Sequence, residues 1–194
     1  FSRPFFEQFY ELFREVPWPS RNVVNNVACD YSNNLGNSKN CYLCFDLDYA
    51  EDSAYIINAY HNKNCFDITT SLKGELNYDS LLIDGCFQTF FSFGCEECRN
   101  VWFSRNCVGC SDCFGCANLR GKQYYIFNQP YTKEAYAEEL KRMNLGSYAA
   151  LTAMRVRVAD FWNTLPYKYM VGYKNTDVSG DWIANSKNAK HMFN

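Results

Sequence analysis

Residues 22–128 show a hydrophobic pattern with a period of three, which differs from the period of two typical of flat strands. One register holds small or apolar residues, the next is rich in aromatic residues, and the third is dominated by Asn, Asp and Gly, which favour tight turns. We therefore expect short extended segments separated by frequent corners, with the first register facing inward. That inward register contains all eleven cysteines: Cys29, Cys41, Cys44, Cys65, Cys86, Cys95, Cys98, Cys107, Cys110, Cys113 and Cys116.

A short motif centred on cysteine recurs through this part of the chain. Its copies are Asn40-Cys41-Tyr42, Asn64-Cys65-Phe66, Gly85-Cys86-Phe87 and Asn106-Cys107-Val108, at spacings of 24, 21 and 21. This recurrence predicts a mainly β fold, a parallel β-solenoid (β-helix) with 21–24-residue coils whose equivalent side chains stack in ladders. The expected core ladder is Cys41, Cys65, Cys86 and Cys107. A tighter twelve-residue coil is the alternative, because positions 29, 41, 53, 65 and 77 are twelve apart.

Helical patterns flank the repeat. Residues 2–16 place Phe5, Phe9 and Phe13 on one apolar stripe; the stretch after Thr132 has the spacing of a capped helix, and a second helix is expected over about 148–163. Residues 185–193 match residues 37–45, which indicates an internal duplication in which the repeat restarts. We thus expect an N-terminal capping helix over residues 1–20, a cysteine-lined β-solenoid over 21–131, a helical segment over 132–166 and the start of a second solenoid array over 167–194.

A family resemblance is carried by residues 2–9, 37–45, 113–119 and 126–128. In these stretches the chain resembles an uncharacterised family of cysteine-repeat, β-solenoid-like proteins from candidate-phylum bacteria. In that family a CxxC-type zinc ribbon precedes the first helix, and a second cysteine-repeat array follows the helical segment. The resemblance therefore implies that this chain is a fragment of a longer protein, and it implies no established activity.

The composition narrows the class of protein. The chain has 194 residues, a net charge of −2 and no run of 18 apolar residues, so we expect no membrane span. The odd number of cysteines favours a reducing compartment, and we expect a cytoplasmic protein. Basic residues are spread over the predicted helices as on ordinary helix surfaces, so nucleic acid is not an expected partner. We expect a protein partner, or self-association, through a solenoid face or an open edge.

The densest cysteine run is the candidate metal site. Cys107, Cys110, Cys113 and Cys116 follow one another at intervals of three, and closely spaced CxxC pairs are typical of zinc and iron–sulfur centres. However, three is also the interval of the repeat itself, so solenoid geometry already explains the spacing. The first expectation is that these thiols face the core as small apolar groups without a cofactor, and a zinc or iron–sulfur site is the alternative.

Carboxylates supply the remaining candidate chemistry. Asp46 and Asp48 are expected on one side of a strand, and a cleft that also included Asp67 would suit a carbohydrate-active β-helix enzyme. His61 and His191 are far apart in the sequence, and no phosphate-binding glycine loop is present. No catalytic residue is therefore assigned. The expected function is a structural or interaction scaffold without catalytic activity; the metal-binding module is the first alternative and the enzyme is the weaker one.

Overall fold

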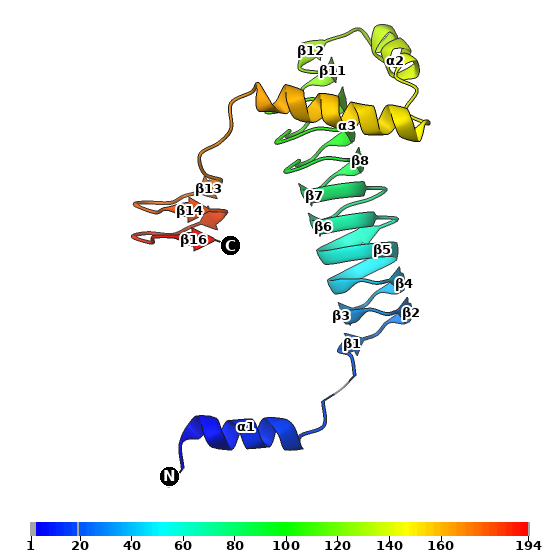
Figure 1. Ribbon diagram of the computed structural model, residues 1–194. Helices are drawn as coiled ribbons and strands as arrows, with labels where there is room; N and C mark the ends of the chain where they lie inside the picture. The colour runs from blue at the N-terminus through cyan, green and yellow to red at the C-terminus, as the bar shows by residue number, and fades with distance from the viewer. Residues whose placement is uncertain (1–2, 19, 194) are drawn as a thin grey trace. The chain divides into compact units, whose positions relative to one another are not determined.

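The computed structural model describes residues 3–18 and 20–193, and it confirms a mainly β fold built as a parallel β-solenoid (Figure 1). The parts of the expected segments at residues 1–2, 19 and 194 lie outside the described residues. The first helix and the strands of the main solenoid are α1 (Phe5–Glu15), β1 (Val23–Val24), β2 (Val27–Asp30), β3 (Asn33–Gly36), β4 (Lys39–Tyr42), β5 (Phe45–Lys63), β6 (Phe66–Leu72), β7 (Tyr78–Asp84), β8 (Phe87–Phe90), β9 (Arg99–Trp102), β10 (Ser111–Phe114), β11 (Gln123–Ile126) and β12 (Gln129–Pro130). The later elements are α2 (Lys133–Arg142), α3 (Tyr148–Asn163), β13 (Gly172–Tyr173), β14 (Gly180–Asp181), β15 (Ile183–Ala184) and β16 (Met192–Phe193).

One coil of the solenoid contains twelve residues. Parallel pairing joins Cys29 to Cys41 and Phe66 to Tyr78, and the same offset of twelve continues to the last parallel strands, β10 and β11. The longer coil predicted from the cysteine motif is therefore wrong, and the twelve-residue alternative is correct. The cysteine motif does not follow the coil length. Its first interval, 24 residues, is two whole coils, but each later interval, 21 residues, is three residues short of two coils.

A left-handed residue at every third position produces the corners. Asn37, Asn40, Leu43 and Asp46 have φ values of 47, 53, 50 and 58°, and the two residues between each pair are extended. Asn, Asp and Gly enter this conformation more easily than other residues, which explains their dominance in one register of the sequence. Because four such corners close one coil of twelve, the cross-section has four sides of three residues each.

The four sides are named here by one coil: side A is residues 40–42, side B 43–45, side C 46–48 and side D 49–51, with equivalents at every twelfth position. The middle residue of each side faces inward, as the burial of Cys41, Cys44, Leu47 and Ala50 shows. A side of three residues is only about 10 Å long. Small side chains fill this narrow interior, and from position 29 to position 119 no inward residue is aromatic or charged.

The predicted core ladder is distributed over three sides. Cys41 and Cys65 are both on side A, two coils apart, whereas Cys86 is on side D and Cys107 on side C. All four side chains are buried. The correction follows from the length of the coil, since each later interval of the motif is one side short of two coils and shifts the cysteine back by one side.

Amide side chains form ladders along the outer corners. Asn34 Nδ2 donates to Asp46 Oδ1 at 2.5 Å, and Asn40 Nδ2 donates to Asp52 Oδ1 at 2.8 Å, in each case one coil later. Asn100 repeats the same bond to Asp112 at 2.7 Å. These contacts give the many Asn residues a second role besides the left-handed backbone, because they tie successive coils together from outside.

The helices form where the sequence predicts them. Thr132 Oγ1 accepts a hydrogen bond from the Ala135 N–H at 3.2 Å at the start of α2. α3 covers residues 148–163, and its Met154 and Val158 are buried. No residue of α1 is buried, so its expected role as a cap on the solenoid stays a prediction. Within the described part of the chain, no helix is long and apolar enough to cross a bilayer.

Residues 159–194 form a second compact unit with the same local geometry. Its strands pair in parallel at an offset of eleven for Gly172 with Ile183 and of twelve for Gly180 with Met192. Ser186 N–H donates to Asn175 Oδ1 at 3.1 Å, just as Ser38 N–H donates to Asn26 Oδ1 at 2.7 Å in the first solenoid. The sequence match between residues 185–193 and 37–45 therefore corresponds to a repeated structural unit.

Two glycines at equivalent corner conformations provide a test of this geometry. Gly115 and Gly109 have φ values of 65 and 60°, but a Cβ on Gly115 would lie 2.9 Å from the Phe127 ring, whereas one on Gly109 meets nothing within 4 Å. We expect Gly109→Ala to lower the free energy of unfolding by about 1 kcal/mol and Gly115→Ala to lower it by roughly 2–3 kcal/mol. Urea denaturation measures both, and equal losses would contradict the assigned packing of Phe127.

Candidate functional site

The eleven cysteines are buried free thiols, and each occupies the middle position of a side. A left-handed residue precedes every cysteine; Asn40 before Cys41 and Asn64 before Cys65 are examples. This corner turns the next side chain toward the axis. The backbone therefore places all eleven thiols inside the solenoid, as the common register of the sequence predicts.

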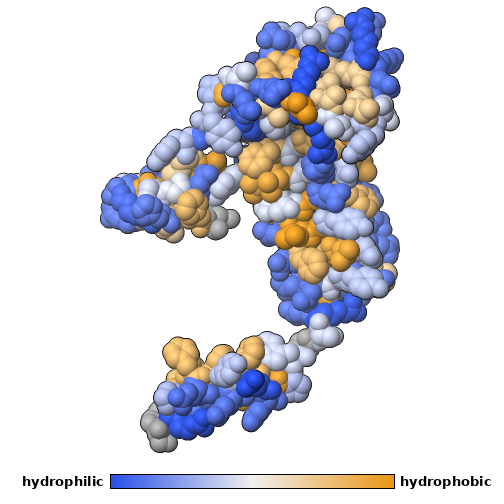
Figure 2. Space-filling model, viewed as in Figure 1, coloured by the Kyte–Doolittle hydropathy of each residue, from blue (hydrophilic) through white to orange (hydrophobic). Residues whose placement is uncertain are grey.

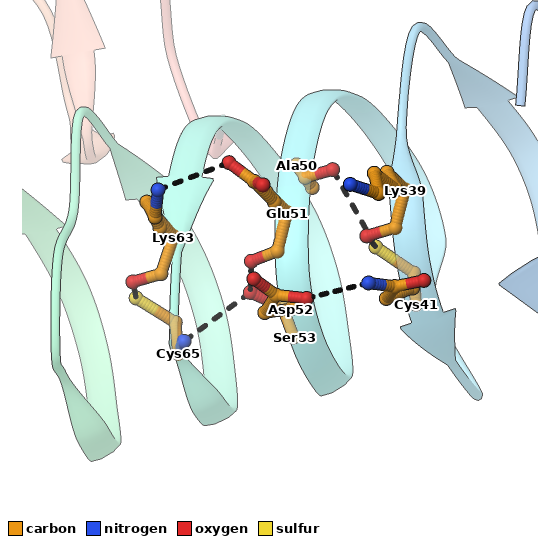
Figure 3. A network of polar contacts seen from close by, with 9 residues as sticks. Lys39, Cys41, Ala50, Glu51, Asp52, Ser53, Lys63 and Cys65 are labelled. Atoms are coloured by element: carbon orange, nitrogen blue, oxygen red, sulfur yellow. Dashed lines mark hydrogen bonds and ion pairs between the residues drawn. The ribbon is translucent and has the colours of Figure 1, made fainter. Parts of the chain in front are cut away.

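The inward cysteine and serine side chains form hydrogen bonds with backbone groups of their own coil and of the next one. Cys41 Sγ donates to the carbonyls of Lys39 at 3.4 Å and Ala50 at 3.7 Å, and its sulfur accepts the Ser53 N–H one coil later. Ser53 Oγ in turn accepts the Cys65 N–H at 3.2 Å (Figure 3). Cysteine and serine thus have the same role at the same position, which is to satisfy buried backbone groups that face the axis.

The candidate metal residues lie on four successive sides rather than in one loop. Cys107 is on side C, Cys110 on side D, Cys113 on side A and Cys116 on side B. Cys110 has the thiols of Cys107, Cys113 and Cys98 as neighbours. Among residues 3–18 and 20–193, however, no group of three or more His, Cys, Asp or Glu side chains is arranged to hold a metal ion.

Contacts among the thiols raise the pKa of some cysteines and lower the pKa of others. The side-chain hydrogen bond from Cys107, together with those from Cys113 and Cys98, lowers the pKa of Cys110, and the same contacts raise the pKa of Cys107 and Cys113. In the other close pair, the bond from Cys41 lowers the pKa of Cys44 to about 7. Cys65 has no thiol partner of this kind, and burial raises its pKa.

The carboxylates do not assemble into the predicted cleft. Asp46 and Asp48 both line a shallow groove on side C, together with Asn34, Asn58 and Tyr60. Asp67 does not line this groove, because its position in the coil places it on side B. The structure therefore brings together two of the three acidic residues and leaves the third on another side.

A row of aromatic side chains at the corner between sides A and B is the surface feature that sequence reasoning missed. Neighbouring rings are in contact in two stretches, from Tyr31 to Tyr55 and from Tyr78 to Phe127. For example, the ring centroids of Tyr42 and Tyr55 are 5.9 Å apart, and those of Phe91 and Phe103 are 4.6 Å apart. We call this row the aromatic ridge, and it consists of Tyr31, Tyr42, Tyr55, Phe66, Tyr78, Phe90, Phe91, Trp102, Phe103, Phe114 and Phe127. Its signal in the sequence is the recurrence of aromatic residues at spacings close to twelve, which becomes visible only once the length of the coil is known.

Helix α3 covers the later part of the aromatic ridge. Arg155 forms an ion pair with Asp79 and lies 4.5 Å from the centroid of Phe91, while Arg157 lies 4.6 Å from the centroid of Phe127. Residues two apart on a helix project in nearly opposite directions, and Phe91 and Phe127 are three coils apart. The helix therefore crosses the ridge between Phe91 and Phe127, and the two arginines extend from its opposite faces toward these rings. The fully buried Phe114 belongs to this covered part of the ridge.

Comparisons with known proteins add little to this description. No protein-family model and no curated protein sequence matches the chain. Among solved structures, it is similar to the UDP-N-acetylglucosamine O-acyltransferase LpxA from Moraxella catarrhalis RH4, with 11% identity and a TM-score of 0.25 over 74% of this chain and 91% of that one. It is also similar to the polySia-specific acetyltransferase NeuO, with 11% identity and a TM-score of 0.18 over 55% of this chain and 79% of that one. At these scores neither likeness carries an argument about activity.

The role of cysteine as a backbone partner can be tested at Cys65, which is fully buried. Its thiol donates to the Lys63 carbonyl at 3.3 Å and accepts the Asn77 N–H. Cys65→Ala leaves that buried N–H without an acceptor, and we expect a loss of about 1–3 kcal/mol in the free energy of unfolding. Cys65→Ser keeps both bonds, so it should lose about 1 kcal/mol less. A serine variant no more stable than the alanine variant, by urea denaturation, would contradict the role.

The solenoid should lose stability at alkaline pH. Because burial raises the pKa of Cys65, the folded chain keeps a proton that the unfolded chain releases above its thiol pKa of about 8.5. This contribution is fully present below about pH 8.5 and is lost as the pH rises toward the folded value. We expect the urea midpoint to fall between pH 7 and pH 10, and to fall less in Cys65→Ser. The same fall in both proteins would exclude Cys65 as a source of the effect.

Proposed function

We propose that this chain is a non-catalytic scaffold that uses the outer surface of its β-solenoid to associate with protein, in the simplest case with further copies of itself. One observation carries the proposal: the thiols are inside, together with small polar and aliphatic side chains, whereas the large aromatic side chains of the first coils are outside. The inward thiols bond backbone groups, whereas Tyr31, Tyr42 and Tyr55 of the aromatic ridge are exposed. Contiguous exposed aromatic residues are typical of association surfaces.

The outer faces of the solenoid carry different kinds of side chain. Side D carries an alternating row of Lys39, Glu51, Lys63 and Glu75, in which Lys63 Nζ lies 3.1 Å from Glu51 Oε2. Side C carries amides and carboxylates, and the corner between sides A and B carries the aromatic ridge. A solenoid holds such rows at fixed spacing, so it can present them as one rigid surface.

The proposal is tested by the association state of the purified chain. We expect sedimentation velocity over a hundredfold range of concentration to show a reversible dimer or larger species. A chain that remains monomeric throughout this range would contradict self-association. High salt should leave an association through aromatic side chains intact, whereas one through the charged row of side D should weaken, because salt screens exposed charges.

A metal-binding module is the second candidate, and the contacts of Cys110 with three other thiols favour it. The scaffold proposal expects eleven titratable thiols after denaturation and no bound zinc or iron by elemental analysis. Cys107→Ser with Cys110→Ser tests the cluster, and Cys29→Ser with Cys65→Ser is the matched control. Stoichiometric metal that only the first pair removes would establish the metal module and overturn the scaffold without a cofactor.

A further inference from the structure

The aromatic ridge has a covered part and an uncovered part. Where α3 crosses it, Phe103 and Phe114 are 2% and 0% exposed, whereas Tyr31 and Tyr55 in the first coils are 75% and 50% exposed. Both parts follow the same corner of successive coils, since Phe66 pairs with Ala54 on one side and with Tyr78 on the other. Figure 2 shows patches of apolar surface on the solenoid. A helix of this chain therefore already binds the ridge at one end, and the same kind of surface continues without one.

Helix α1 is the unpartnered apolar helix of this chain. Phe5, Phe9 and Phe13 follow one another along its stripe with ring centroids 5.8 and 6.2 Å apart, and their side chains are between 46 and 70% exposed. Leu12 and Val16 extend the stripe. Since none of the residues of α1 is buried, its apolar stripe has no described surface that covers it.

From these two observations we infer that α1 of one copy docks on the uncovered ridge of a second copy, at Tyr31, Tyr42 and Tyr55. The inference rests on the proposed self-association and names its surface. Continuity with the α3 contact carries it, because the ridge already binds a helix whose Arg155 and Arg157 lie over its rings. The acidic face of α1, with Glu7, Glu11 and Glu15, would then stay in water.

A reciprocal exchange closes this contact in a dimer. Each copy gives one helix and receives one, so the interface is the same on both copies and leaves no free ridge or stripe. A large aromatic side chain buries up to about 150–250 Å². The six rings of one dock are 42–75% exposed, so only about half of this area is still available. Complete burial at both docks gives about 1,000–1,700 Å², which reaches the lower part of the roughly 1,200–2,000 Å² of a stable protein interface.

Two double variants separate the partners of the contact. The helix variant is Phe9→Glu with Phe13→Glu, and the ridge variant is Tyr42→Glu with Tyr55→Glu. All four side chains are exposed, so both variants should fold, which circular dichroism checks. The control, Tyr148→Glu with Tyr169→Glu, changes residues that are 83 and 94% exposed outside the proposed contact.

We expect each variant to dimerise at least tenfold more weakly than the wild type and the control in sedimentation velocity. An equimolar mixture should regain a heterodimer through one dock, because the helix variant keeps its ridge and the ridge variant keeps its helix. A dimer that neither variant weakens, or a mixture that regains nothing, would overturn this inference. The first of these results would leave the proposed self-association standing.

Hydrogen exchange of the wild-type chain is independent of any substitution. On dilution from dimer to monomer, amide protection should fall together in residues 5–16 and in residues 31–55. Protection of α1 that persists in the monomer would show that the helix covers its own chain, and it would overturn exchange between copies. Loss of protection elsewhere only would place the dimer contact on another surface and overturn the inference as well.

Discussion

The fold depends on one hydrogen bond that recurs along the axis. Where the inward residue twelve positions earlier is Ser or Asn, its side chain accepts the N–H of the inward residue in the next coil. Ser32 accepts from Cys44, Ser53 from Cys65 and Asn77 from Thr89, at 3.1, 3.2 and 2.9 Å. A buried N–H without such an acceptor is costly. Beside its aliphatic residues, the inward register therefore favours Cys, Ser and Asn, which are small and still offer sulfur or oxygen. This requirement is one physical reason for the abundance of cysteine in the inward register.

The same constraint moves the large side chains to the surface. A coil of twelve residues leaves an interior too narrow for a ring, so the aromatic residues that form the core of other proteins lie outside and stack along a corner. Part of this aromatic ridge is buried again by α3, where Arg155 and Arg157 flank the contact. The remainder is exposed. The solenoid thus has an interior of thiols, small polar groups and aliphatic side chains, and its aromatic rings lie along one outer corner. An association that covers this ridge adds hydrophobic burial to that of the core.

Sequence reasoning was strongest where the signal is local. The period of three identifies the inward register, because one left-handed corner in each triplet repeats along the chain, and the helix spanning 148–163 has the predicted bounds. It failed on the coil length. Cys41 and Cys65 are on the same side of the solenoid, but Cys86 and Cys107 are on other sides. The intervals of 24 and 21 residues look alike in the sequence, although only 24 is a whole number of coils. Four corners of a quarter turn each decide the closure, and that number is a property of the assembled backbone.

The sequence by itself determined the β-solenoid, the inward direction of the eleven thiols and the order of repeat and helices, since each follows from a local pattern of side-chain size and backbone preference. Only the tertiary structure decided which residues become neighbours. It separates Asp67 from Asp46 and Asp48, spreads Cys107 to Cys116 over four sides, and aligns aromatic residues from successive coils into one ridge. The physical reason is that a coil closes by summing its corners. A change of one triplet in spacing alters no local pattern, yet it moves a side chain to another face.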